Sequence, residues 1–239
     1  GILSQKAVAS DYSLNEQIVE YYKWKGGSLS LFTPSVCNRL DRNTSGIILA
    51  GMSLKGTQML SRVLKARTID KYYLTIVCGT VAQATTIKGF LCKKKNHNQV
   101  VIFRTKEEAL ANGYQEAAFI ETQYQPLAHG KSGKEDFTLL KVKLVTGKTH
   151  QIRAHLKSVG HPIIGDGKYG LKSVNAYIKS AFGIRHQLLH AFYIRFPEDI
   201  DSVLAGKSFT AMPEESFLQA IYAMFDSIQT KEDLEKKML

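Results

Sequence analysis

The sequence predicts an α+β fold, with a mixed, largely antiparallel β-sheet flanked by helices and loops. Two observations favour this class: expected strands outnumber expected helices, and several neighbouring strands are joined by short turns rather than by helical crossovers. Of the 239 residues, 44% are hydrophobic and 22% charged, which is typical of a soluble globular protein with a substantial core. Because no repeat or linker divides the chain, we expect one domain over residues 1–239, with a charged tail at 226–239.

The first third of the chain alternates helix and strand signals. Residues 13–16, Ser-Leu-Asn-Glu, have the capping-box form, so a helix is expected from there to about Lys25. The apolar run at residues 46–50 predicts a buried strand, and Ser53 is expected to cap a second helix. Residues 73–77 alternate in the manner of a strand.

The middle of the chain predicts strands and one hairpin. Shorter strands are expected near residues 85–91 and 100–104. The segments 117–127 and 137–145 flank the Gly-Lys-Ser-Gly sequence at 130–133, which is typical of a hairpin tip.

The last third predicts helices around one apolar strand. Thr149 is expected to cap a helix over residues 150–159, and residues 188–196 read as a strand. Pro213 is placed to open a C-terminal helix, and residues 230–239 are expected to form a frayed helical tail.

Charge is the informative feature of the composition. With 32 Lys and Arg against 21 Asp and Glu, the net charge is +11, which suits a nucleic-acid partner. No apolar run approaches the ~20 residues of a membrane helix. The three cysteines show no disulfide or zinc pattern, so we expect the reducing cytoplasm and no membrane partner.

Motifs for nucleotide hydrolysis and metal catalysis fail on spacing. The Gly-Lys-Thr of residues 147–149 lacks the glycine of a phosphate-binding loop, because Val142 occupies that position. His150 and His155 are five positions apart, whereas the histidines of a zinc-protease pair are at positions i and i+4. The motifs of zinc-dependent base deaminases are also missing, so no metal is expected.

The segment around Asp41 is chemically unusual. Its carboxylate lies between Arg39 and Arg42, among small polar residues and directly before an apolar run. Arginine neighbours favour the ionised form of a carboxylate. From the residues alone an ion-paired structural turn is the favoured interpretation, and a catalytic carboxylate is the alternative.

Four segments together resemble the RluA-type pseudouridine synthases, in that family's order. Residues 39–46, Arg-Leu-Asp-Arg-Asn-Thr-Ser-Gly, resemble the family's signature. Residues 71–79 are similar to its tyrosine-bearing strand, and residues 146–170 to its arginine-bearing motif. Residues 189–197 resemble a late core strand. The resemblance implies the pseudouridine synthase catalytic fold.

The sequence departs from the family pattern at two places. Family members usually carry a His directly before the Arg-Leu-Asp run, where this chain has Asn38. The family also carries an Asn-Lys-Pro-x-Gly strand, and Gly1 is similar to the glycine that ends it. We therefore expect this first strand, and any small upstream RNA-binding domain, to be missing from the sequence.

The resemblance implies a catalytic trio. Asp41 matches the catalytic aspartate, which either attacks the sugar or stabilises its positive charge; both remain open. Tyr73 matches a tyrosine that packs on the uracil and is a candidate for proton transfer. Arg153 matches an arginine that would hold Asp41 by bidentate pairing.

The resemblance also implies contacts with RNA whose target base is flipped out of its stack. Arg39 and Arg42 are expected to fill the gap left by the base or to hold flanking phosphates, and His150 and Gln151 are further expected contacts. The lysines of residues 93–95, with His97, are expected to form a solvated loop.

The resulting hypothesis is an RNA pseudouridine synthase that acts on ribosomal RNA, ahead of transfer RNA, as a monomer and without metal or cofactor. The rival hypothesis, motivated by the net charge of +11, is a non-catalytic RNA-binding or ribosome-assembly module. Intact Asp41, Tyr73 and Arg153 count against that rival, because a binding module does not need them.

Overall fold

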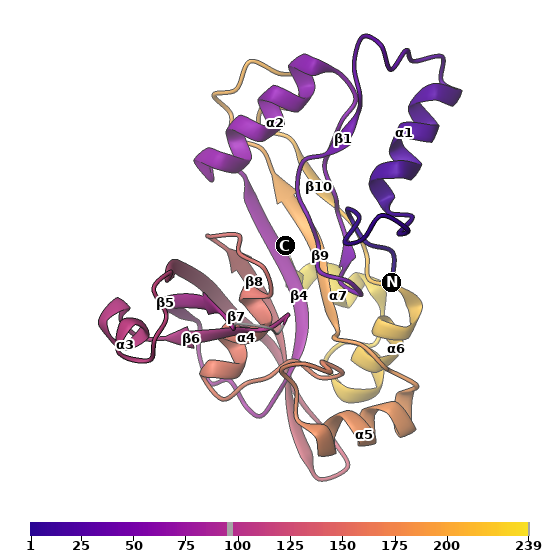
Figure 1. Ribbon diagram of the computed structural model, residues 1–239. Helices are drawn as coiled ribbons and strands as arrows, with labels where there is room; N and C mark the ends of the chain where they lie inside the picture. The colour runs from indigo at the N-terminus through magenta and orange to yellow at the C-terminus, as the bar shows by residue number, and fades with distance from the viewer. Residues whose placement is uncertain (95–97, 239) are drawn as a thin grey trace. The chain divides into compact units, whose positions relative to one another are not determined.

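The computed structural model describes residues 1–94 and 98–238, so Lys95, His97 and Leu239 of the expected loop and tail lie outside the described residues. The chain divides into two compact units. The first contains Gly1–Asp70 and Tyr193–Ala211, and the second contains Lys71–Phe192 and Met212–Leu239. Helices accompany a mostly antiparallel sheet, which confirms the expected α+β class (Figure 1).

The first unit begins with helices and very short strands. In chain order these are α1 (Leu14–Trp24), β1 (Ser35–Val36), β2 (Ser45–Gly46), β3 (Ala50–Gly51) and α2 (Leu54–Ala66). β1 and β3 pair antiparallel, with Ser35 opposite Gly51. The Ser53 hydroxyl accepts a hydrogen bond from the Gly56 amide at 3.2 Å, which confirms Ser53 as the expected cap of α2.

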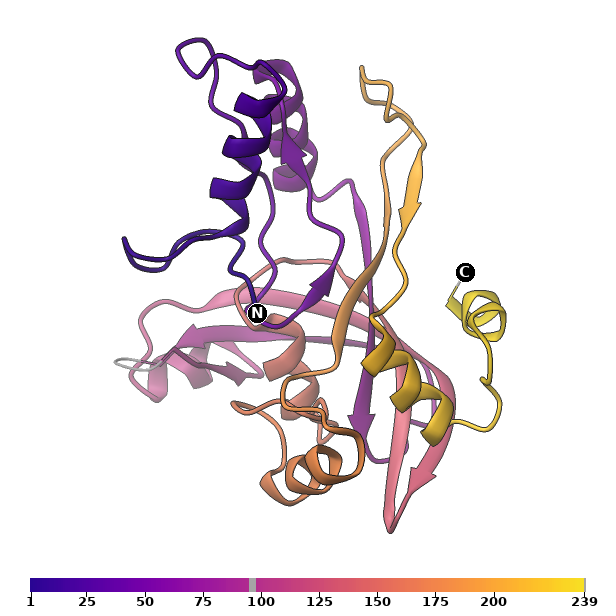
Figure 2. The same ribbon diagram turned by 90° about the vertical axis from the view of Figure 1, so that its right-hand side faces the viewer.

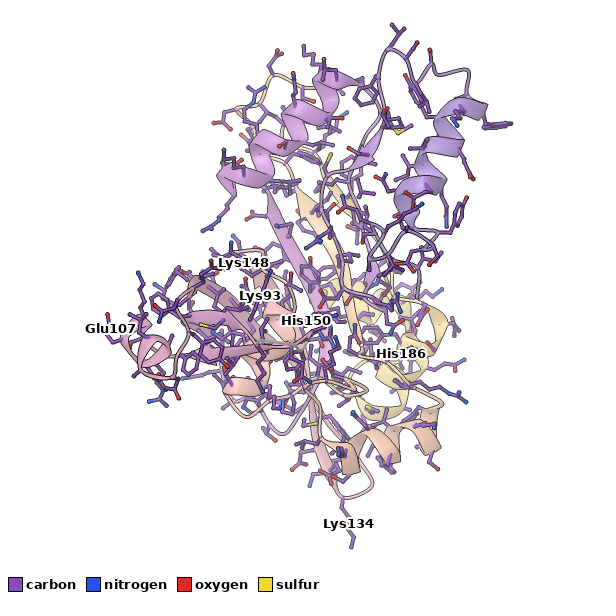
Figure 3. The ribbon with its side chains drawn as sticks, in the orientation of Figure 1. Lys93, Glu107, Lys134, Lys148, His150 and His186 are labelled. Atoms are coloured by element: carbon purple, nitrogen blue, oxygen red, sulfur yellow. The ribbon has the colours of Figure 1, made fainter. Side chains whose placement is uncertain are left out.

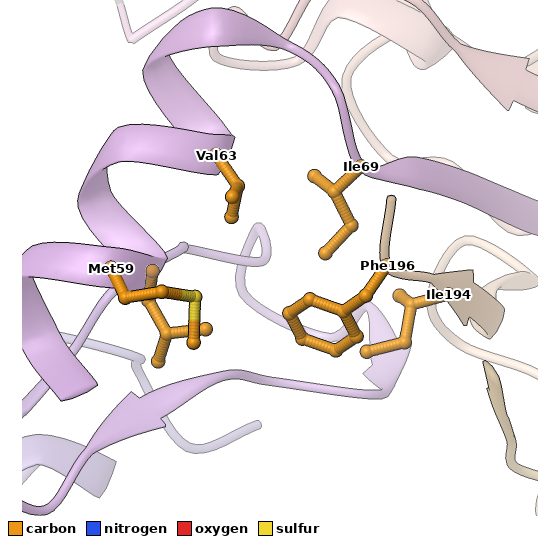
Figure 4. Packing of buried hydrophobic residues seen from close by; sticks show 6 residues of the cluster. Met59, Val63, Ile69, Ile194 and Phe196 are labelled. Atoms are coloured by element: carbon orange, nitrogen blue, oxygen red, sulfur yellow. The ribbon is translucent and has the colours of Figure 1, made fainter. Parts of the chain in front are cut away.

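The core of the first unit forms where α2 meets the end of the strand β9 (Leu189–Arg195). Met59 and Val63 from α2 pack with Ile194 and Phe196, and Ile69 completes the contact (Figure 4). The end of β9 also pairs antiparallel with β10 (Ser208–Thr210). Burying these side chains holds α2 in place, because each stabilises folding by roughly 1.5–3 kcal/mol.

The second unit is built on an antiparallel sheet. Its strands are β4 (Asp70–Cys78), β5 (Thr85–Lys93), β6 (Val100–Phe103), β7 (Ala118–Ser132) and β8 (Glu135–Leu144). They lie in the order β4-β8-β7-β5-β6, and each neighbouring pair is antiparallel. The expected hairpin is confirmed as β7 and β8, with Lys134 at its tip (Figure 3).

The second unit also contains helices. They are α3 (Lys106–Ala111), α4 (Gln151–Ser158), α5 (Lys172–Phe182), α6 (Glu215–Met224) and α7 (Lys231–Met238). α4 contacts β6 and β7, and α6 lies along β7 (Figure 2). The apolar cluster beneath α4 contains Leu91, Val100, Ile120, Ala154 and Tyr169. This packing fixes α4, which carries several of the expected site residues.

Residues 46–50 do not form the continuous strand that their apolar character predicted. Only residues 45–46 and 50–51 are regular strand. The Leu49 amide donates to the Asn38 side chain at 2.7 Å, while the Leu49 carbonyl accepts from the Cys37 amide at 2.7 Å. The Asn38 side chain thus binds the Leu49 amide where a neighbouring strand would normally do so. Sequence periodicity does not reveal such a bond.

The start of α4 also differs from expectation. His150, not Thr149, is the N-cap residue, and its φ of 56° lies in the left-handed region. A Lys148 carbonyl accepts from the Gln151 amide at 3.0 Å, and the Gln151 side chain accepts from the Lys148 amide at 3.1 Å. A tight turn thus begins the helix in place of a threonine cap.

The C-terminal tail is a packed helix rather than a frayed one. Leu234 and Met238 of α7 are buried, and Lys141 of β8 donates its ammonium to the Met238 carbonyl. Helices α3 and α5 were not predicted. Among the described residues, no helix has the length and apolar character needed to cross a membrane.

Candidate active site

Asp41 lies in the first unit, on the loop between β1 and β2. The loop closes at Asp41 with a tight turn, because the Thr44 amide donates to the Asp41 carbonyl at 2.9 Å. Asn43, inside the turn, has a φ of 69°, a left-handed conformation that Asn tolerates better than most residues. The turn leaves Asp41 half-buried and Arg42 exposed. The tight turn expected from the residues alone is therefore present, and the catalytic role of Asp41 stays a prediction.

Asn38 stands where the family usually has His, and the structure gives it a local role. Its side-chain oxygen accepts the bond from the Leu49 amide across the base of the Asp41 loop. An amide side chain provides this acceptor at any pH, whereas an imidazole nitrogen does so only when unprotonated. Asn38 therefore helps to hold the shape of the loop that carries Asp41.

Tyr73 lies in the second unit, near the start of β4, and its side chain is only 6% exposed. It is paired with Val142 of β8 and shares a strand face with Thr75 and Val77. Val77 bridges to Ile163, which belongs to the segment following α4. β4 therefore supports Tyr73 and also anchors the segment that leads to Asp166.

Arg153 lies on α4 and is held by a carboxylate that the sequence had not singled out. Its Nε and Nη2 atoms donate to the two carboxylate oxygens of Asp166 at 2.7 and 2.9 Å. Both side chains are almost fully buried, at 5% and 0% exposure. The guanidinium carbon also lies 5.2 Å from the ring centroid of Tyr169. Within the second unit, Arg153 thus makes a bidentate pair with Asp166, and its expected pairing with Asp41 stays a prediction.

Asp166 is the centre of a dense set of hydrogen bonds. Its Oδ1 atom accepts not only from Arg153 but also from the amides of Lys168 and Tyr169, at 2.8 and 3.0 Å. The side chain of Asn175 on α5 binds the backbone at the same place. Its oxygen accepts from the Gly165 amide and its nitrogen donates to the Asp166 carbonyl, each at 2.9 Å. The position of the carboxylate is therefore held by several bonds besides those to Arg153.

Electrostatics favour the ionised form of Asp166. Burial by itself would raise its pKa, but the hydrogen bonds and positive charge of Arg153, together with the Lys168 and Tyr169 amides, lower the pKa below its ordinary value of 3.8. At neutral pH the pair is thus a guanidinium locked against a carboxylate. Such a pair holds orientation well, because both groups resist rotation.

His150 and Gln151, expected to contact RNA, are buried, at 7% and 2% exposure. His150 Nδ1 lies 3.0 Å from the Tyr169 hydroxyl, which also accepts from the Val100 amide. These contacts tie the start of α4 to the residue that packs on Arg153.

Gln151 uses its whole side-chain amide inside the protein. The oxygen accepts from the Thr146 hydroxyl and from the Lys148 amide. The nitrogen donates to the Glu121 carbonyl and to the Thr122 hydroxyl. Because an amide has two donor and two acceptor positions, no capacity remains for a ligand. We therefore assign Gln151 a structural role, in place of the expected RNA contact.

The structure brings some expected residues together within each unit. Arg39, Asp41 and Arg42 share one loop of the first unit, with both arginines exposed. Arg153, His150 and Gln151 share α4 and its start in the second unit. The meeting of Asp41 with Tyr73 and Arg153 stays a prediction.

Sequence reasoning missed Asp166, Tyr169 and Asn175. The first two lie inside the block at residues 146–170 that resembled the arginine-bearing motif, and that block was the signal available. Nothing in the spacing identified Asp166 as the partner of Arg153. Within the described residues, no group of three or more His, Cys, Asp or Glu side chains gathers as a metal site requires.

Comparison with known proteins decides the family. A family model described as RNA pseudouridylate synthase matches residues 2–158. The chain belongs to the RNA pseudouridylate synthase family. The matched range contains Asp41, Tyr73 and Arg153.

Curated relatives in the RNA pseudouridylate synthase family support the RluA-type resemblance. The chain is 32% identical over 187 residues to ribosomal large subunit pseudouridine synthase C of Haemophilus ducreyi, covering 78% of this chain and 53% of the relative. It is 31% identical over 160 residues to ribosomal large subunit pseudouridine synthase D of Nitrosomonas europaea, covering 66% and 42%. The chain thus spans about half the length of these relatives.

Solved structures of pseudouridylate synthases share the fold. Human RNA pseudouridylate synthase domain containing 4 superposes with a TM-score of 0.70 at 18% identity, over 93% of this chain and 85% of that one. Human RNA pseudouridylate synthase domain containing 1 gives a TM-score of 0.63 at 24% identity, over 85% and 79%. At these identities the likeness supports the fold alone.

Proposed function

We propose that the protein isomerises uridine to pseudouridine in RNA, with the Asp41 carboxylate as its essential group. The observation that carries the proposal is the family match over residues 2–158, which contains Asp41, Tyr73 and Arg153. Relatives named as large-subunit pseudouridine synthases make ribosomal RNA the proposed substrate class.

The reaction breaks the bond from uracil nitrogen to the ribose, turns the base and forms a bond from carbon to the ribose. The base carbon loses a proton and the base nitrogen gains one, so atoms and electrons balance without an oxidant or a leaving group. For that reason we propose no redox cofactor and no metal. The sugar carbon becomes electron-poor as the first bond breaks, and a carboxylate meets that need by attack or by charge stabilisation.

Each site residue has a proposed part in this reaction. Asp41 acts at the sugar, and Tyr73 packs against the uracil and moves a proton. Arg153 orients Asp41 with the edge of its guanidinium that does not face Asp166, because five N–H donors allow two acceptors to be held at once. The exposed Arg39 and Arg42 replace the flipped base or hold neighbouring phosphates.

We further propose that the protein acts as a monomer in the cytoplasm. Three free cysteines, Cys37, Cys78 and Cys92, suit a reducing compartment. Light scattering during gel filtration measures the mass in solution, and a mass of twice 26.7 kDa or more would contradict the monomer.

The test of the proposed activity is the Asp41→Asn variant. Asn has nearly the same shape but no charge, so turnover should fall by at least a thousandfold. Activity is measured as tritium released from ribosomal RNA labelled at carbon five of uridine. An exposed residue outside the site, in Glu198→Gln, is the matched control. Turnover retained in Asp41→Asn would reject the role proposed for Asp41. RNA binding by the native protein without any pseudouridine formation would instead favour the rival binding module.

A further inference from the structure

The loop that carries Asp41 has little regular structure of its own. β1 ends at Val36 and β2 begins only at Ser45. A catalytic side chain must be held within about half an ångström of its productive position, and strands hold such groups more precisely than loops do. Between these two strands the backbone is held by other hydrogen bonds, and two of them reach Leu40, the residue before Asp41.

Ser4 holds that residue from both sides. Its hydroxyl donates to the Leu40 carbonyl at 3.2 Å and accepts from the Leu40 amide at 3.0 Å. A serine hydroxyl has one proton and two lone pairs, so it satisfies both groups at the same time. Ser4 is only 6% exposed, so water competes little for these bonds.

Ser4 is itself fixed to the start of α1. The amides of Leu14 and Asn15 donate to the carbonyls of Leu3 and Ser4 at 2.8 and 3.2 Å, and the N-terminal segment therefore lies beside the base of α1 (Figure 2). The first turn of this helix is closed by Glu16, which accepts from the Ser13 amide and hydroxyl at 2.9 and 2.6 Å.

The same helix turn also holds the other end of the segment before Asp41. The Asn15 side-chain oxygen accepts from the Val36 amide at 3.0 Å. Residues 36–40 are thus attached at one end to Asn15 and at the other to Ser4, and Ser4 is attached to Asn15. This closed circuit restrains the backbone immediately before Asp41, while the Thr44 turn restrains it immediately after.

We propose that Ser4 is a positioning residue for the Asp41 carboxylate. The inference rests on the proposed function, because it assigns Ser4 a part in that reaction through Asp41. Without the hydroxyl, the Leu40 amide and carbonyl lose their fixed partner, and the loop gains freedom where the carboxylate must meet the sugar. A misplacement of about 1 Å costs on the order of a hundredfold in rate. A partial loss of restraint should therefore cost about tenfold.

The test compares Ser4→Ala with Ser13→Ala. The control removes a buried serine hydroxyl at the same end of α1 but leaves in place the Ser4–Leu40 bonds and the bond from the Ser13 amide to Glu16 that closes the helix turn. Turnover number and RNA dissociation constant are measured with tritiated RNA, at a temperature where thermal unfolding shows each variant to be fully folded. We expect a tenfold loss of kcat in Ser4→Ala, less than twofold in Ser13→Ala, and RNA affinity within twofold of the native protein in both.

A second readout does not depend on activity. In native-state hydrogen exchange the Leu40 amide should exchange about tenfold faster in Ser4→Ala and at the native rate in Ser13→Ala. Unchanged exchange at Leu40 would overturn the proposed anchor, and so would a Ser4→Ala variant that keeps more than half of the native kcat. If the native protein makes no pseudouridine, the proposed function fails, and the exchange experiment still decides whether Ser4 restrains the loop.

Discussion

Replacing Asp166 by Asn tests how the protein prepares Arg153. In the native structure Oδ1 accepts from Arg153 Nη2 and from the Lys168 and Tyr169 amides, while Oδ2 accepts from Arg153 Nε. An Asn oxygen in the Oδ1 position keeps three of these bonds. Its nitrogen then faces the Arg153 Nε–H group, so two donors oppose each other where a 2.7 Å bond had been.

The substitution also removes the negative charge that faces a guanidinium of 5% exposure. Breaking a buried ion pair at one partner costs about 3–5 kcal/mol of unfolding free energy, and the three bonds that survive place Asp166→Asn near the lower end, at about 3 kcal/mol. The matched control is Glu198→Gln, which breaks the exposed Arg195–Glu198 pair and should cost no more than about 1 kcal/mol.

The assay is urea unfolding followed by circular dichroism between pH 7 and pH 3. Because Arg153 lowers the pKa of Asp166 below 3.8, its stabilisation is present above that value and is lost as the pH falls through the lowered pKa. The gap between native protein and Asp166→Asn should therefore stay constant near neutral pH and narrow below pH 3.8. A gap under 1 kcal/mol at pH 7, or one that widens in acid, would refute the reasoning.

Two further predictions concern α4. The Arg153→Lys variant should lose most of its turnover, because one ammonium cannot make both bonds of a planar guanidinium, while its RNA affinity should change less than threefold. Equal losses in kcat and in RNA affinity would instead indicate that Arg153 contacts a phosphate. Burial lowers the pKa of His155 from 6.5 to about 4, so the unfolded chain binds its proton first and stability should fall as the pH drops from 6.5 toward 4. In His155→Gln the loss of unfolding free energy between pH 7 and pH 4.5 should be smaller by about 2 kcal/mol, and parallel urea-unfolding curves for the two proteins would contradict this.

Local signals predicted much of the secondary structure. The capping box at residues 13–16 placed the start of α1, and Ser53 placed the start of α2. Such signals work because a cap or a turn is satisfied by residues a few positions away. The strand predicted over residues 46–50 was wrong for the opposite reason, because the Leu49 amide donates to the side chain of the distant Asn38, a bond that periodicity cannot show.

In the candidate site, too, the sequence predicted some residues and not others. The motif residues Asp41, Tyr73 and Arg153 could be named from the sequence, because the order of their segments is a property of the chain. The partner of Arg153 could not, since Asp166 reaches it only after the segment beyond α4 has docked on the end of β4. Gln151 is a different case. Its place beside a motif predicted an RNA contact, but the structure shows that its side chain makes four hydrogen bonds inside the protein.

The amino-acid sequence by itself determined the fold class, the family resemblance and the chemistry-bearing residue types, because these depend on composition, short-range pattern and order along the chain. Tertiary structure alone decided which polar groups are satisfied inside the protein: Ser4 by Leu40, Gln151 by its neighbours, and Arg153 by Asp166. The physical reason is that a hydrogen bond depends on distance and direction in space, and residues 36 positions apart acquire both only on folding.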